Sequence, residues 1–213
     1  MLPGTLLTDP TWLADRIIDT GRRWDCANAR INATLWWYSA SSTFVADPLE
    51  ALLATGRTLT PRLQELRFTL RANGYLATTQ SSVTVDGAER YSAALIDAYA
   101  DIITPLATIS GAAPRALWAI ASDSVANRAL DAGTALNRIP DASALAAVLC
   151  RPPFIRPRFT TASVETSRHR PCGTPIIRRT SCCLIYQATG GDKCTSCPRR
   201  PRQPVRHPDS PAR

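Results

Sequence analysis

The chain changes character near residue 150, and this change limits what it can fold into. Residues 1–150 contain 12 Lys and Arg against 14 Asp and Glu, whereas residues 151–213 contain 13 against 3. Apolar residues recur at helical spacing in the first part, while proline and arginine dominate the second. Hydrophobic residues make up 45% of the chain, which is enough to bury a core. The sequence therefore predicts two physically different parts, a folded body and a basic C-terminal part.

The apolar periodicity of the body predicts a mainly helical structure. Leu66, Phe68 and Leu70 depart from it, because they alternate with polar residues before the turn residues Asn73 and Gly74. This stretch predicts a small antiparallel β element at about 64–86. We therefore expect an α+β fold with a mainly α-helical body, whose helices lie at about 8–22, 25–45, 47–56, 89–110, 114–136 and 141–149.

Proline content and charge predict the domain organisation. We expect a helical body with a β-hairpin insertion at 1–150 and a proline- and arginine-rich link at 151–175. A cysteine-bearing module at 176–198 follows. The last segment, 199–213, lacks the apolar residues needed for packing and is predicted to be disordered.

The N-terminus and the apolar stretches indicate a cytoplasmic protein without a membrane span. The first residues lack the basic n-region of a secretory signal, and stretches such as the one from Thr34 stop short of the roughly 20 apolar residues that cross a bilayer. Thiols stay reduced in the cytoplasm, and the chain has seven cysteines, an odd number. Both points favour metal binding or redox chemistry over disulfides.

Four cysteines lie within CCLIYQATGGDKCTSC, at positions 182, 183, 194 and 197. The Cys194–Cys197 spacing places two thiolates one turn apart, where they can chelate a metal. Cys182 and Cys183 point to opposite faces of an extended chain, so both can bind one ion only if the backbone bends. A [2Fe-2S] cluster accommodates such a pair more easily, because its ligands are spread over two irons. The spacing favours the cluster without excluding zinc.

The residues between the cysteines predict a C-terminal cysteine-bearing β-hairpin. Leu184, Ile185 and Tyr186 are strand-forming, and Gly190-Gly191 suits a hairpin turn. Such a hairpin would return Cys194 beside Cys183.

The stretch RRTSCCLIYQATGGDKCTSCP resembles the C-terminal signature of the FhuF family of ferric-siderophore reductases. The resemblance implies that Cys182, Cys183, Cys194 and Cys197 bind the irons of a [2Fe-2S] cluster. It also implies one-electron reduction of a ferric siderophore, with the hydroxamate type favoured, and release of Fe²⁺ in the cytoplasm. The helical patterns of residues 28–56 and 115–130 are similar to the helical body of that family.

Three basic residues flank the cysteines: Arg178, Arg179 and Lys193. Their positive charge is expected to stabilise the reduced cluster or to attract an anionic siderophore. The alternative is that they are solvated charges beside a surface site.

Other reactive residues give no support for acid–base or nucleophilic catalysis. His169 and His207 lie in arginine-rich surroundings outside any triad or HExxH pattern, and His169 is not needed as a cluster ligand. Cys172 is a spare thiol near the signature, whereas Cys26 and Cys150 are expected to be small core residues. The sequence contains no P-loop and no GxGxxG, so the electrons are expected from an external donor such as a ferredoxin or flavoprotein.

Two other functions remain open from the sequence. One is a general [2Fe-2S] electron carrier, and the other is a zinc module whose arginine tail binds nucleic acid. The tail is not favoured for nucleic acid, because it has no aromatic residue beyond His207 for stacking. Trp36, Trp37 and Trp118 are expected to fill the core, with a siderophore cavity as the alternative.

Overall fold

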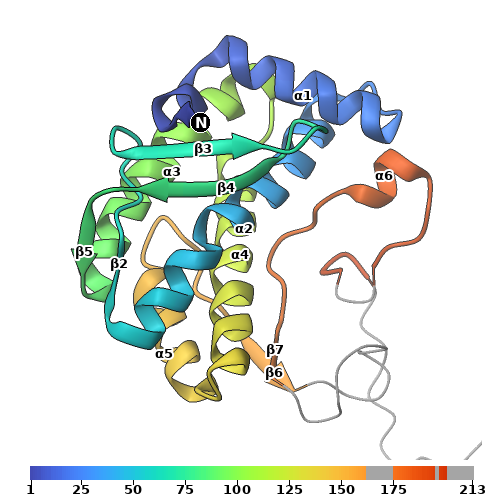
Figure 1. The fold of residues 1–213 in the computed structure, drawn as a ribbon. Helices are drawn as coiled ribbons and strands as arrows, with labels where there is room; N and C mark the ends of the chain where they lie inside the picture. The colour runs from blue at the N-terminus through green and yellow to red at the C-terminus, as the bar shows by residue number, and fades with distance from the viewer. Residues whose placement is uncertain (162–174, 195–196, 201–213) are drawn as a thin grey trace, which may run out of the picture.

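The chain folds into a bundle of helices with small antiparallel sheets at its periphery, as the computed structural model in Figure 1 shows. The structure describes residues 1–161, 175–194 and 197–200. The helices are η1 (Gly4–Thr8), α1 (Pro10–Trp24), α2 (Ala29–Thr55), α3 (Ala88–Ser110), α4 (Pro114–Ala135), α5 (Ile139–Leu149) and α6 (Ile185–Thr189). The strands are β1 (Leu2–Pro3), β2 (Arg57–Leu59), β3 (Leu66–Leu70), β4 (Leu76–Ser81), β5 (Thr84–Asp86), β6 (Phe159–Thr161) and β7 (Pro175–Ile177).

The strands form three antiparallel sheets in the described residues. β1, β3 and β4 form one sheet in the order β1-β3-β4, β2 pairs with β5, and β6 pairs with β7. In β3, Leu66 and Phe68 are buried while Arg67 is exposed, as the alternation predicted. The α+β, mainly helical fold and its β element near residues 64–86 are thus confirmed.

Helix α2 is longer than the sequence indicated. Two helices were expected with a break near Asp47, but one helix runs from Ala29 to Thr55 through Pro48. A proline inside a helix removes one backbone hydrogen bond. Phe44, Leu49 and Leu52 are buried on both sides of it, and their packing holds the helix together across that position. Gly56 ends the helix with a positive φ of 74°, as expected of a glycine stop.

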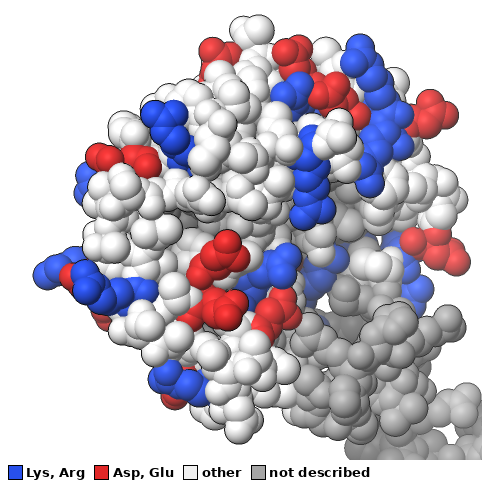
Figure 2. All heavy atoms as spheres, in the orientation of Figure 1, with Lys and Arg blue, Asp and Glu red and all other residues white. Residues whose placement is uncertain are grey.

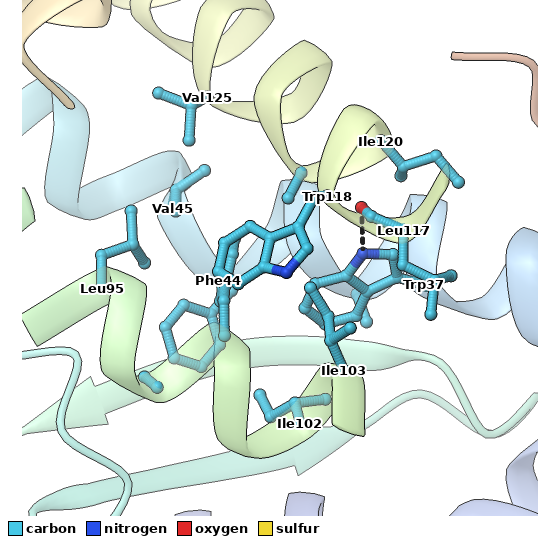
Figure 3. Close-up of a cluster of buried hydrophobic side chains, with 14 of the residues drawn as sticks. Trp37, Phe44, Val45, Leu95, Ile102, Ile103, Leu117, Trp118, Ile120 and Val125 are labelled. Carbon is cyan, nitrogen blue, oxygen red and sulfur yellow. Dashed lines mark hydrogen bonds between the residues drawn. The ribbon is translucent and has the colours of Figure 1, made fainter. Parts of the chain in front are cut away.

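The core lies between α2, α3 and α4 and is rich in aromatic rings (Figure 3). The indole Nε1 of Trp37 donates a hydrogen bond of 2.9 Å to the Leu117 carbonyl. The ring of Tyr99 lies 5.0 Å from that of Trp37 and 6.4 Å from that of Trp118. Trp36, Trp37 and Trp118 are buried, so the prediction that they fill the core is confirmed.

Helix α3 is, among the described residues, the helix long and apolar enough to cross a membrane by length and composition alone. The core helix of a globular protein meets the same criterion. Its Tyr91, Leu95 and Ile102 are at most 1% exposed, and Figure 3 shows Leu95 and Ile102 among the buried side chains of the core. This burial accounts for the apolar composition of α3.

Charges of both signs are interspersed on the face shown in Figure 2. This mixture agrees with the nearly balanced count of acidic and basic residues in 1–150. The predicted tail at 199–213 lies outside the described residues from position 201 onward.

The C-terminal part contains a hairpin, but the cysteines lie after it. The hairpin is formed by β6 and β7, with Phe159 opposite Ile177. The strand pair expected between Cys183 and Cys194 is wrong, because Ile185–Thr189 forms the short helix α6. Leu184 adopts a left-handed backbone with φ 63° and turns the chain into this helix, while Gly190 ends it with φ 65°. The strand propensity of these residues is outweighed here by the packing of Leu184 against α2.

Candidate functional site

The C-terminal segment lies along helix α4 before it reaches the cysteines. In Figure 1 it continues from β7 past α4 toward α6, which lies near α1 and α2. Before β6, the backbone N–H of Ile155 donates a hydrogen bond of 2.8 Å to Ser122 Oγ of α4. Ile177 then packs against Ala126 and Leu130 of α4. The segment that bears the cysteines is therefore packed onto the helical body.

Asp123 of α4 fixes the two residues that precede the cysteines. Its Oδ1 accepts hydrogen bonds from the backbone N–H and the hydroxyl of Thr180, both at 3.0 Å. Its Oδ2 accepts the backbone N–H of Ser181 at 2.9 Å and the Ser181 hydroxyl. A buried carboxylate must be compensated by donors, and these four bonds provide that compensation. We refer to Asp123, Thr180 and Ser181 as the Asp123 anchor.

Cys183 and Leu184 pack against the N-terminal half of α2. Together with Ile31 and Leu35 they form a small buried cluster, separate from the main core. We call these four residues the docking patch. Each is between 6% and 8% exposed. Cys26 is partly buried against the same patch, so it lies near the signature cysteines rather than in the main core where the sequence placed it.

Three of the four predicted cysteines, Cys182, Cys194 and Cys197, are linked by thiol contacts, while Cys183 packs into the docking patch. The sulfurs of Cys182 and Cys197 are 3.6 Å apart, and Cys197 also shares a hydrogen bond with Cys194. Two thiolates that bind one tetrahedral metal at about 2.3 Å lie about 3.8 Å apart. The Cys182–Cys197 distance is close to that value. The backbone N–H of Cys197 also donates a hydrogen bond of 3.0 Å to the Cys194 carbonyl.

The two contacting thiols differ in how readily they ionise. Burial raises the pKa of Cys182, a backbone hydrogen bond from Leu184 lowers it, and the bond with Cys197 adds to the rise. Burial also acts against ionisation of Cys197. There it is outweighed by a backbone hydrogen bond from Arg199, the bond with Cys182 and the charge of Arg179, so the pKa of Cys197 falls below its usual value. Cys197 is therefore the thiol of this pair that ionises more readily to the thiolate, the form that binds metal.

Of the three predicted basic residues, Arg179 is the one placed against a sulfur. Its Nη1 donates to Cys194 Sγ at 3.7 Å, and its guanidinium lies 5.0 Å from the ring centre of Tyr38. Burial lowers the pKa of Arg179. The neighbouring Tyr38 and negatively charged groups raise it by more, so the net shift of the pKa is upward. Lys193 points elsewhere, donating to the Arg199 carbonyl at 3.1 Å, and Arg178 is exposed.

The donor set fits an iron–sulfur cluster. Within residues 1–161, 175–194 and 197–200, no three His, Cys, Asp or Glu side chains surround a single point. Thiol contacts link Cys182 to Cys197 and Cys197 to Cys194 without gathering the thiols around one point, which suits ligands spread over two irons better than four ligands around one zinc ion. Backbone hydrogen bonds to Cys182 and Cys197 add the N–H···S contacts that stabilise thiolates in such sites.

A separate cavity of about 200 Å³ lies between α2, β2 and β4. Its lining includes Phe44, Ala51, Thr58 and Leu66, and none of the cysteines. Phe44 follows Leu35 of the docking patch by nine residues, or about 14 Å along a helix axis. The cavity is therefore not part of the cysteine site.

Sequence reasoning missed Asp123 and the docking patch. Asp123 was detectable as a lone acid inside an otherwise small and apolar helical stretch, AIASDSVA, where a charge needs a buried partner. No comparable signal marks Leu184. Three residues that the sequence singled out, His169, Cys172 and His207, lie outside the described residues.

Comparison with known families bears on this same segment. Residues 179–199 match the family model of the FhuF 2Fe-2S C-terminal domain, which confirms the resemblance predicted from the sequence. The match begins at Arg179 and includes all four cysteines of the site. No curated protein and no solved structure is significantly similar to the chain.

Proposed function

We propose that this chain, which carries a FhuF-type 2Fe-2S C-terminal domain, reduces ferric iron held by a siderophore and releases Fe²⁺ in the cytoplasm. The observation that supports this most is the contact among thiols within the matched residues, where the Cys182 and Cys197 sulfurs lie 3.6 Å apart and Cys197 shares a hydrogen bond with Cys194. When bound there, a [2Fe-2S] cluster supplies a one-electron carrier. Cys182, Cys183, Cys194 and Cys197 would hold it.

The residues of the site act through burial, exposure and charge. Cys183 and Cys197 are buried toward the body, while Cys182 and Cys194 are partly exposed. We propose that an electron passes to a docked complex on the side of these two partly exposed cysteines. Hydroxamate oxygens are hard ligands that hold Fe³⁺ better than Fe²⁺, so gain of one electron loosens the complex. The chemistry requires no acid or base from the protein.

The charge around the cysteines suits anionic partners. Residues 175–200 contain five Lys or Arg and one acid, Asp192. Arg178, Arg199 and Arg200 are exposed. A positive surface attracts an acidic electron donor, and we propose a ferredoxin or flavoprotein in that role. The same charge favours an anionic ferric siderophore.

The test begins with protein purified without oxygen. We expect a visible [2Fe-2S] spectrum with about two irons and two sulfides per chain, and its loss in C197S. The dithionite-reduced protein is then mixed with a ferric hydroxamate, and the return of the oxidised spectrum is timed against buffer alone. We expect faster reoxidation with the ferric complex and formation of Fe²⁺, trapped by a colorimetric chelator.

Three results would contradict the proposal in different ways. A colourless protein that binds zinc would remove the cluster. A cluster that ferric hydroxamate does not reoxidise would leave a general electron carrier. Equal reoxidation by C197S protein would show that the signature cysteines do not carry the electron.

A further inference from the structure

The Arg179 side chain is buried with hydrogen-bond donors left over. It is 8% exposed, and its Nε and Nη2 have no hydrogen-bond partner among the described residues. Nη1 is the atom that contacts Cys194 Sγ. Burying unpaired guanidinium donors is costly, because they lose their bonds to water. The unpaired donors of Arg179 therefore indicate that hydrogen-bond acceptors bind beside the thiols.

Asp123 determines where this guanidinium lies. Its carboxylate is 3.8 Å from Arg179 Nε, which is an ion-pair distance but too long for a hydrogen bond. The same carboxylate holds Thr180 and Ser181, the next two residues, by four hydrogen bonds. With the backbone fixed there and the ring of Tyr38 on another side, the position of Arg179 is constrained from two helices.

Resting on the proposed function, we infer that Asp123 is a positioning residue, which holds Arg179 so that its free donors hydrogen-bond to the sulfurs of the cluster. Hydrogen bonds and positive charge at the sulfurs stabilise the reduced, more negative state and raise the reduction potential. Asp123 thereby affects the reduction potential of the cluster without contacting it, because it determines the position of Arg179.

The direction in which D123N shifts the reduction potential distinguishes a positioning role of Asp123 from a direct effect of its charge. If Asp123 acted only through its own negative charge, D123N would raise the potential, since a nearby anion opposes reduction. If Asp123 positions Arg179, D123N lowers the potential, because the guanidinium leaves the sulfurs. Arg179 contacts a sulfur directly, so the loss of its placement outweighs the loss of the more distant carboxylate.

The experiment measures the midpoint potential of the loaded full-length protein. We expect D123N and R179Q each to lower the reduced-to-oxidised ratio about tenfold at a given potential, which equals 59 mV for one electron. The double variant should fall no further than R179Q, because both changes remove one interaction. D131N is the matched control, since it removes the same charge from the same helix. We expect it to leave the potential unchanged.

A second variant avoids any change of charge. T180V/S181A removes two of the four anchor bonds and should also lower the potential. In the cluster-free protein, D123N should speed hydrogen exchange at the Thr180 and Ser181 amides, which D131N should not. This readout tests the anchor without the cluster.

The outcomes distinguish this inference from the proposed function. A raised or unchanged potential in loaded D123N would overturn the positioning role of Asp123 alone. The same holds if R179Q and D123N lower the potential additively. A chain that binds no cluster under any condition would overturn the proposed function and this inference together.

Discussion

The docking patch provides the most direct test of how the helical body protects the cysteines. Leu35 of α2 is 6% exposed and packs with Cys183 and Leu184. Replacing a buried Leu by Ala costs about 2–5 kcal/mol, depending on how far the site can collapse. The patch is bordered by partly buried side chains that can move in, so we expect L35A to cost about 2 kcal/mol.

That cost is expected to act on docking of the segment. Each 1.4 kcal/mol is a factor of ten in an equilibrium constant, so about 2 kcal/mol lowers the ratio of docked to undocked segment about 30-fold. The assay is the rate at which an excess of iron chelator bleaches the cluster absorbance without oxygen. If chelation follows undocking, bleaching of L35A protein is about 30-fold faster than that of the unchanged protein.

The control is L95A. Leu95 is fully buried in the main core and lies outside the docking patch, so its loss weakens the body without touching the cysteine segment. We expect L95A to lower the urea midpoint of unfolding at least as much as L35A while bleaching near the unchanged rate. Equal bleaching of the two variants would refute the reasoning, because protection would then depend on global stability.

Two further predictions concern the body itself. Burial, with the charge of Asp123, raises the pKa of Cys150 from 9.0 to about 12, so at pH 8 this thiol holds about a thousandfold less thiolate than an ordinary one. Mass spectrometry of native protein treated with iodoacetamide should find Cys150 unmodified, and modification as fast as in urea would contradict this. W37F removes the hydrogen bond to Leu117 and should cost about 1–3 kcal/mol in urea unfolding with the cluster spectrum retained. A spectrum lost in folded W37F would contradict the separation of core and site.

The parts of the fold that depend on local pattern could be predicted from the sequence. Alternation at Leu66 and Phe68 gave the strand, and helical spacing gave the helices. Pro48 led to a wrong prediction of a helix break, because the lost backbone hydrogen bond is offset by the packing of buried neighbours that no local pattern reveals. Leu184 misled for the same reason. The strand propensity of the following Ile185 and Tyr186 is real, but Leu184 is buried against α2 and adopts a φ of 63° that turns the chain into α6.

The candidate site divides in the same way. The cysteine spacing is local, so Cys182 and Cys197 could be named from it. The sequence pointed to Arg178, Arg179 and Lys193 alike as charges near the signature, and only packing against Tyr38 and Asp123 distinguishes Arg179 as the one that contacts a sulfur. Asp123 could not be assigned, because its partner Ser181 is 58 residues away and the contact exists only after α4 and the segment have packed together.

The path of the cysteine segment over α4 and α2 also sets an order of events during synthesis. A chain leaves the ribosome from its N-terminus, and folding proceeds in that direction. The helices that carry Asp123 and Leu35 are therefore made before the four cysteines emerge. In a chain whose body has misfolded, iron would encounter thiols that are not docked on α2 and α4. Iron content can thus serve as a measure of how much of a preparation has matured correctly, from its first helices to its last thiol.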